Sequence, residues 1–278
     1  MKKITALMLS SAMMLSLAAC GGSASTDAVS SEAVSSEAAS SEAVSTAEAA
    51  PAALTTVNAG KLTMSTNAAF PPYEMTTDSG EFEGIDIDVA AAIAEKLGLE
   101  LQIDDMDFDA ALLSVQQGKA DIVMAGVTVT DERKAVMDFS DSYATGIQSI
   151  IVPNDSEIAS PDDLAGKKIG TQRGTTGYIY CSDDFGDENV VAYDDGLTAV
   201  QALNNGQVDA VVIDNAPAQE FVAANPGLKV LDTSYAEEDY AIGVAKGSAL
   251  EDAVNKALEE LKADGTLQAI VDKYINAN

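Results

Sequence analysis

Short apolar runs alternate with longer segments of helical periodicity from about residue 60 onwards. The apolar runs predict strands at 61–65, 99–103, 121–125, 147–152, 168–171, 189–192, 210–213, 229–231 and 240–245. The helical pattern predicts helices at 86–97, 108–117, 131–137, 197–204, 216–224, 250–263 and 266–275. Strands that alternate with helices in this way predict an α/β fold with mainly parallel sheets.

Polar, turn-rich segments divide this alternating region. They lie at 153–155, at 160–168 and again at 234–239, where the sequence reads SYAEED. We interpret them as the borders of a lobe inserted within another: 58–146 forms the first part of lobe 1, 147–233 forms lobe 2, and 234–278 returns through the hinge to complete lobe 1. Two doubly wound sheets joined by a two-strand hinge would leave a cleft, and clefts between lobes favour small ligands.

The N-terminal segment has the pattern of a processing signal. Lys2 and Lys3 precede an apolar stretch at 4–19, which ends in Leu-Ala-Ala-Cys at Cys20. This ending resembles a bacterial lipobox, so we expect a signal peptide at 1–19 and lipidation of Cys20. The alternative is an ordinary secretory peptide that contains a cysteine. Two acyl chains on Cys20 would anchor the protein stably on the extracytoplasmic face of the cell membrane.

Residues 20–57 contain little besides Ser, Ala and Glu, with SSEAV-like units that begin at Ser30, Ser35 and Ser40. Such a segment has no large apolar face to bury, which predicts a disordered tether. Transient helix is the alternative, although the paired serines disfavour a stable one.

Composition excludes several kinds of function. The formal net charge of −30 disfavours nucleic acid and anionic lipid as partners. The chain has no histidine, which removes His-dependent catalysis and zinc motifs. Cys181 is the one cysteine besides Cys20, and we interpret it as an apolar filler.

No motif predicts a metal or a cofactor. Asp105, Asp107 and Asp109 resemble the start of a calcium loop, but Ala110 and Gln116 stand where such a loop needs Gly and Glu. The Gly- and Thr-rich segment 170–177 lacks the Lys-Ser/Thr ending of a phosphate-binding loop. We therefore expect neither a metal nor a cofactor.

The segment 125–140, which reads AGVTVTDERKAVMDFS, combines hydroxyls, free backbone N–H groups and a guanidinium at the start of a predicted helix. Arg133 in the first turn could hold a small carboxylate with a two-pronged hydrogen bond. The same residues are also ordinary capping chemistry for a solvated helix. The segment alone leaves both interpretations open.

Five separated motifs resemble one family in their order along the chain. They are FPPYEM with GEFEGIDIDVAAAIAEKLG, DFDAALLSVQQGKADIVMAGVTVTDERKAVMDFSDSY, DLAGKKIGTQRGTTG, GQVDAVVIDNAPA and ALEELKADGTLQAIVDKY. Together they resemble the polar amino-acid-binding proteins of bacterial ABC importers, solute-binding protein family 3. The resemblance covers 58–278 and implies a two-lobed periplasmic-binding-protein fold, a monomer, ABC permease subunits as partners and no enzymatic activity.

The resemblance also implies a pocket formed by both lobes: Asn67, Phe70, Phe108, Ala125, Gly126, Thr128, Arg133, Gln172, Gly174, Thr175, Thr176 and Asp214. Arg133 would hold the ligand α-carboxylate, with help from Thr128 and the Gly126 backbone. The segment 174–176 would open a helix whose N–H groups and hydroxyls cap the same carboxylate.

Asp214 would accept the α-ammonium, while Phe70 and Phe108 would sandwich the ligand side chain. Each assignment has an alternative: the phenylalanines could be core residues, and Asp214 could cap the helix that follows it.

Side-chain preference depends on few positions. Relatives that bind lysine or arginine usually carry an acid at the position of Asn67, and Gln172 is also neutral. Ala125 stands where some relatives have a hydroxyl, whereas Glu74 could attract a cation. We therefore expect a neutral polar or moderately apolar L-amino acid. Two rivals remain: a cyclohexadienyl-dehydratase-like enzyme using Glu74 or Asp214 as its acid, and a ligand-sensing receptor.

Overall fold

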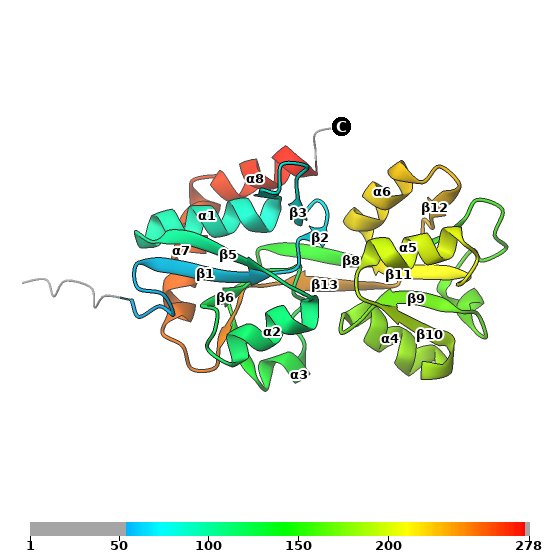
Figure 1. Ribbon diagram of the computed structural model, residues 1–278, viewed down its shortest axis with the longest axis horizontal. Coiled ribbons are helices and arrows are strands. Elements are labelled where there is room, and N and C mark those ends of the chain that lie inside the picture. Colours follow the sequence, from blue (N-terminus) through cyan, green and yellow to red (C-terminus); the bar gives the residue numbers. More distant parts are fainter. Residues whose placement is uncertain (1–53, 276–278) are drawn as a thin grey trace, which may run out of the picture. The chain divides into compact units, whose positions relative to one another are not determined.

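Two mixed sheets and a small third sheet organise residues 54–275, the part of the chain that this computed structural model describes (Figure 1). These residues belong to one compact unit, Pro51–Asn278. The predicted signal peptide at 1–19, the lipidation of Cys20 and the tether up to residue 53 lie outside the described residues.

The first sheet has the order β5-β1-β6-β14-β7 in the described part of the chain. Its strands are β1 (Lys61–Thr66), β5 (Glu100–Asp105), β6 (Ile122–Val123), β7 (Met137–Phe139) and β14 (Gly243–Ala245). β1 pairs in parallel with β5 and β6, whereas β14 is antiparallel to β6 and β7. β1 is buried along almost its whole length, which is typical of a central strand covered on both faces.

The second sheet has the order β10-β9-β11-β8-β12, with β13 also paired to β8. Its strands are β8 (Ala144–Pro153), β9 (Ile169–Gln172), β10 (Val190–Tyr193), β11 (Ala210–Asp214), β12 (Leu228–Val230) and β13 (Ala236–Tyr240). β9 pairs in parallel with β10 and β11, while β11, β12 and β13 are antiparallel to β8. β8 and β13 carry the chain into and out of this sheet.

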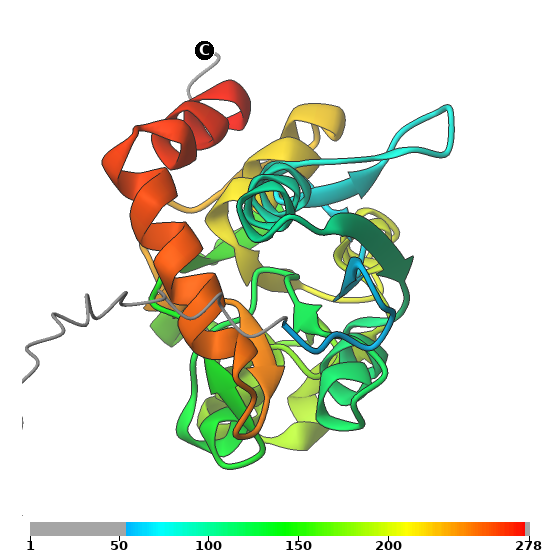
Figure 2. The same ribbon diagram turned by 90° about the vertical axis from the view of Figure 1, so that its left-hand side faces the viewer.

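Helices cover both sheets. The α-helices are α1 (Ile85–Leu97), α2 (Phe108–Gln116), α3 (Asp131–Lys134), α4 (Thr176–Phe185), α5 (Gly196–Asn204), α6 (Asn215–Ala224), α7 (Leu250–Ala263) and α8 (Thr266–Tyr274). Two short 3₁₀ helices lie at Pro161–Leu164 and Asp187–Asn189. α7 and α8 pack on α1 at the first sheet (Figure 2). At the second sheet, α5 and α6 lie opposite α4 (Figure 1).

A small antiparallel sheet of β2 (Ala69–Phe70), β3 (Glu74–Thr76) and β4 (Phe82–Glu83) lies between β1 and α1 in sequence. The sequence pattern did not predict it, because two- and three-residue strands are too short to show alternation. This sheet brings Phe70 and Glu74 to the carboxyl end of β1.

Four predictions about elements need correction. The sheets are mixed rather than mainly parallel. β8 runs antiparallel to β11 and β13, and β14 runs antiparallel to β6. The polar segment 234–239 is not a turn-rich break but contains most of β13, and the predicted strand 240–245 is the end of β13 followed by β14. The predicted helix 131–137 ends at Lys134, because Met137 begins β7 and pairs with Ala245.

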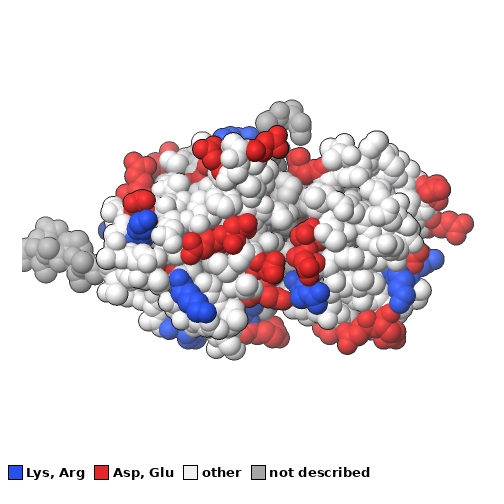
Figure 3. All heavy atoms as spheres, viewed as in Figure 1, with Lys and Arg blue, Asp and Glu red and all other residues white. Residues whose placement is uncertain are grey.

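Acidic side chains are spread over the face seen in Figure 3, with isolated basic ones among them. This distribution matches the net charge of −30. Among the described residues, no helix combines the length and the apolar character needed to cross a membrane.

Candidate ligand site

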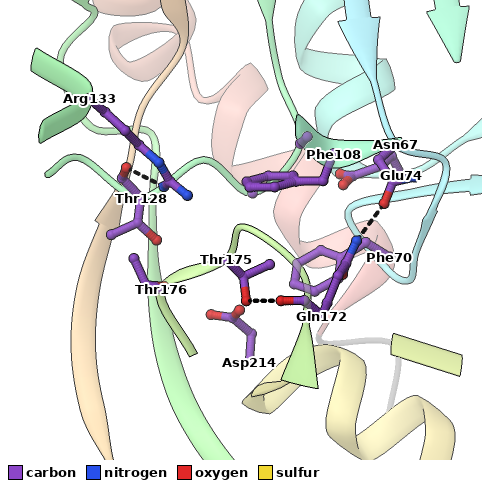
Figure 4. A pocket seen from close by; sticks show the side chains of 12 residues that line it. Asn67, Phe70, Glu74, Phe108, Thr128, Arg133, Gln172, Thr175, Thr176 and Asp214 are labelled. Carbon is purple, nitrogen blue, oxygen red and sulfur yellow. Dashed lines mark hydrogen bonds between the residues drawn. The ribbon is translucent and has the colours of Figure 1, made fainter. Parts of the chain in front are cut away.

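A small cavity lies where the strands of both sheets end. It is lined by Asn67, Phe70, Glu74, Phe108, Ala125, Gly126, Thr128, Arg133, Gln172, Thr175, Thr176 and Asp214 (Figure 4). The carboxyl ends of strands are where α/β sheets ordinarily place ligands. The structure therefore brings together eleven of the predicted site residues and adds Glu74. Gly174 is also close, since its carbonyl oxygen accepts a hydrogen bond from Arg133 Nη2 at 3.2 Å.

Arg133 is a buried cation, with an exposed fraction of 8 %. Its backbone N–H donates to the hydroxyl of Thr130, which caps α3. Its Nη1 donates to the Thr128 carbonyl oxygen at 2.7 Å, and its guanidinium lies 5.3 Å from the ring centre of Phe108. Burial lowers the pKa of Arg133. Within residues 54–275 no carboxylate forms an ion pair with this guanidinium.

Asp214 is a buried carboxyl at the end of β11, also 8 % exposed. It accepts hydrogen bonds from the Tyr240 hydroxyl and from Gln148 Nε2, the latter at 2.9 Å. Burial is the main cause that raises the pKa of Asp214 to about 7, and the charge of Glu238 adds to it. Asp214 occupies the N-cap position of α6, yet its side chain makes no capping hydrogen bond there. Local capping therefore does not account for this carboxyl.

Glu74, which lines the cavity, and Asp86 are two neighbouring buried acids. Asp86 accepts hydrogen bonds from the Tyr143 hydroxyl at 2.6 Å and from the Gly126 N–H at 3.0 Å. Burial and the neighbouring Asp86 charge raise the pKa of Glu74 well above its usual range, while burial raises the pKa of Asp86 to about 6. Both shifts favour the protonated form of the carboxyl.

The bond between Gly126 and Asp86 corrects one expectation. The Gly126 N–H was expected to face the ligand carboxylate, but it is already donated to Asp86. Gly126 itself is required by geometry: its φ is +55°, and a Cβ there would lie 2.9 Å from the Phe70 ring.

Phe70 and Phe108 both line the cavity, and they come from two different elements, β2 and the first turn of α2 (Figure 4). Each also belongs to a cluster of buried apolar residues, and Phe70 stacks on Tyr73 with ring centres 5.9 Å apart. The two interpretations that the sequence left open, core residue and pocket wall, therefore apply together.

Asn67 and Gln172 meet across the cavity at the end away from Arg133 (Figure 4). Gln172 Nε2 donates to Asn67 Oδ1 at 2.8 Å, and Asn67 Nδ2 donates to the Met106 carbonyl oxygen at 3.0 Å. Asn67 follows β1 of the first sheet and Gln172 ends β9 of the second sheet. This hydrogen bond therefore connects the part of the cavity wall at the first sheet with the part at the second sheet.

Sequence reasoning missed Glu238, a carboxyl of β13 that is only 6 % exposed. Its Oε2 accepts hydrogen bonds from the Thr128 hydroxyl, the Thr176 hydroxyl and Gln148 Nε2. The signal that could have found it is the alternation of β13, in which Glu238 and Tyr240 are buried and Glu237 and Asp239 are exposed.

Comparison with known proteins decides the family. The model of the bacterial extracellular solute-binding proteins, family 3, matches residues 62–277. The chain belongs to that family.

Individual family 3 relatives are similar along most of their length. The L-cystine-binding protein TcyJ of Escherichia coli K12 is 33 % identical over 223 residues, 79 % of this chain and 84 % of TcyJ. AbpA of Streptococcus pneumoniae is an amino acid ABC transporter substrate-binding protein, and its crystal structure was solved with L-arginine bound. The structure of AbpA matches with a TM-score of 0.73 and 36 % identity, over 77 % of this chain and 94 % of AbpA. An ancestral arginine-binding protein bound to glutamine has a TM-score of 0.74 and 43 % identity, over 78 % and 98 % of the two chains.

Membership in family 3 confirms the resemblance deduced from the sequence motifs, and these structures confirm the two-lobed α/β fold. These relatives are named as binding proteins, and the family as extracellular. Family membership does not by itself assign a role to each side chain of the cavity.

Proposed function

We propose that this protein captures an L-amino acid by closure of two lobes and delivers it to an ABC importer. One observation carries the proposal: within residues 54–275, a buried guanidinium without a carboxylate partner and a buried carboxyl without a cationic partner face the same cavity. These are Arg133 and Asp214. A zwitterion supplies the missing partner to each, and burying either charge unpaired is costly. The names of AbpA and TcyJ support an amino acid as the ligand.

Closure would occur about β8 and β13, between lobe 1 (58–146 with 234–278) and lobe 2 (147–233). Two hydrogen bonds join the proposed lobes across the cavity, Gln172 to Asn67 and Arg133 to the Gly174 carbonyl oxygen, and opening would break both. The ligand docks first on lobe 1 through Arg133 and the two phenylalanines, and lobe 2 adds Asp214 and the start of α4. Binding energy favours the closed form through the contacts made only there.

A neutral polar side chain fits the far end of the cavity best. Asn67 and Gln172 present amides, which both donate and accept hydrogen bonds. Burial and the neighbouring Asp86 charge raise the pKa of Glu74, which disfavours the charged form that a cationic side chain would need. The ancestral relative, which is named as an arginine-binding protein, has been solved with glutamine and also with arginine.

Replacing Asn67 by aspartate is expected to shift this preference towards arginine and lysine. The new carboxylate would face the ligand side chain inside a cavity of low dielectric constant, where one charge pair changes affinity strongly. We expect the ratio of arginine to glutamine affinity, measured by calorimetry, to rise at least tenfold in Asn67→Asp. An unchanged ratio of arginine to glutamine affinity would mean that the end of the ligand side chain does not lie at Asn67.

Ligand affinity is expected to fall at acid pH. Binding of an ammonium requires ionised Asp214, whose pKa is about 7 in the ligand-free protein. Below that pH the carboxyl must first lose a proton, so the dissociation constant rises about tenfold per pH unit. From pH 7.5 to 5.5 we expect a loss of roughly 20- to 30-fold by calorimetry. A flat profile would contradict the role of Asp214.

The ligand-free protein should show the opposite trend in stability. Because the pKa of Asp214 in the folded state exceeds the ordinary value of 3.8, the folded state holds this proton more tightly than the unfolded chain. Its contribution to the free energy of unfolding therefore decreases as pH rises from about 4 to 7. Asp86 acts in the same direction up to about pH 6.

The proposal extends to the N-terminal residues. We place the protein, as a monomer, on the extracytoplasmic face of the membrane, held by acyl chains on Cys20 and the tether that follows it. Incorporation of labelled palmitate that is lost in Cys20→Ala tests the anchor.

Thermal unfolding in the presence of each of the twenty L-amino acids tests the function itself, because a bound ligand raises the melting temperature by mass action. We expect glutamine or another neutral polar amino acid to give the largest shift, followed by recovery of unchanged ligand. Turnover of the ligand would favour the dehydratase-like alternative. No shift with any amino acid would overturn the proposal.

A further inference from the structure

Glu238 is placed where it contacts both sides of the cavity without lining it. Thr128 follows β6 of the first sheet, and Thr176 begins α4 beside the second. Their hydroxyls donate to the same Glu238 oxygen, Oε2, at 3.1 and 3.0 Å. Gln148 Nε2 donates to that oxygen at 3.0 Å and to Asp214 Oδ2 at 2.9 Å, so one amide links the two carboxylates.

These bonds fix the direction of the two hydroxyls. A threonine hydroxyl has one hydrogen and two lone pairs, and a carboxylate oxygen can only accept. Because Thr128 and Thr176 give their hydrogens to Glu238, only lone pairs remain on each hydroxyl to face the cavity. One lone pair of Thr176 accepts from Gln148 Nε2 at 3.5 Å, which leaves the other for a ligand. Neither hydroxyl can then donate to a ligand carboxylate, which is the role that the sequence suggested for them.

We propose that Glu238 is a positioning residue that holds the hydroxyls of Thr128 and Thr176 as acceptors towards the cavity, so that this end of the site selects an ammonium group. The proposal rests on the proposed function and deepens it. Three acceptors, the two hydroxyl oxygens and the Asp214 carboxylate, would then surround the α-ammonium, while Arg133 alone supplies side-chain donors to the α-carboxylate. The charge of Glu238 adds to the negative potential at the same end.

Glu238→Gln tests this role with little change in shape. An amide can donate as well as accept, so a threonine hydroxyl can turn its hydrogen into the cavity. We compare L-glutamine with glutaramic acid, which is glutamine without its amino group, by calorimetric titration and by competition. The variant is expected to bind glutamine at least tenfold more weakly, with glutaramic acid changed less than about threefold. The ratio of the two affinities is the readout, because general damage to the site would weaken both ligands alike.

The matched control is Glu237→Gln, the same change on the exposed face of the same strand. It should leave both affinities unchanged. Thr128→Val, alone and combined with Glu238→Gln, provides a second line of evidence that does not need Glu238→Gln to fold. The valine variant should lose glutamine selectively, and the double variant should lose less than the two single losses multiplied, because both changes act through one hydroxyl.

Equal losses of glutamine and glutaramic acid in Glu238→Gln, or unchanged glutamine affinity in Thr128→Val, would overturn the role of Glu238 while leaving amino-acid capture intact. Failure of the unchanged protein to bind glutamine or any other neutral polar amino acid would instead overturn the proposed side-chain preference, and this inference with it.

Discussion

Replacing Arg133 by alanine is expected to abolish detectable amino-acid binding while the protein stays folded. The guanidinium is buried beside Phe108 and has no carboxylate partner within the described residues. A ligand α-carboxylate that loses this partner remains desolvated inside the cavity. Truncating one side of a buried charge pair costs about 2–5 kcal/mol, which is roughly a 30-fold to several thousandfold loss of affinity.

The fold should survive the change, because the Arg133 guanidinium donates to the carbonyl oxygens of Thr128 and Gly174 and not to a carboxylate. Its removal therefore leaves no buried charge unpaired. Circular dichroism and thermal unfolding of the ligand-free variant check this. Arg173→Ala is the matched control: Arg173 is exposed and pairs with Asp194 at the surface. Normal binding by Arg133→Ala would show that the carboxylate site is assigned to the wrong residue.

Replacing Asp214 by asparagine is expected to weaken binding by a similar amount, about 2–5 kcal/mol. The amide keeps the shape of the side chain beside Tyr240 and Gln148 but cannot carry the charge that pairs with an ammonium. The unchanged protein at pH 5.5, in which Asp214 is largely protonated, should lose affinity towards the lower end of that range.

The pH profile separates a charge role from a structural one. The loss of affinity below pH 7 should disappear in Asp214→Asn, because the group that titrates is gone. Asp209→Asn, on the exposed side of the turn before β11, is the control and should keep the pH dependence of the unchanged protein. A variant that binds weakly yet keeps the full pH dependence would mean that another carboxyl receives the ammonium.

The sequence predicted the elements that repeat a strong pattern. β11 begins with the continuous apolar run at 210–213, in which every residue is buried, and α5 and α7 show a clear helical period. It failed at 131–139, where good helix formers precede a strand. Pairing of Met137 with Ala245, more than a hundred residues away, decides that segment, and no local pattern contains this information.

The candidate site likewise contains residues that a local pattern reveals and residues that only distant contacts explain. Arg133, Asp214 and the two phenylalanines carry chemistry that can be recognised in a motif. Glu238 lies in AEEDY, where three acids in succession indicate a solvated turn, although the strand buries the middle one. The sequence also could not show that Asp86 takes the Gly126 N–H, because that bond joins positions 40 residues apart. Buried polar groups that serve a site break the hydrophobic pattern on which sequence reasoning depends.

A crystal structure of the protein with the L-amino acid that gives the largest thermal shift tests the central claim most directly. The account predicts the α-carboxylate on the Arg133 guanidinium and the α-ammonium on the Asp214 carboxylate. It also predicts the ligand side chain between Phe70 and Phe108, with its end at Asn67 and Gln172. A ligand bound outside this cavity, or one whose ammonium lies away from Asp214, would contradict it.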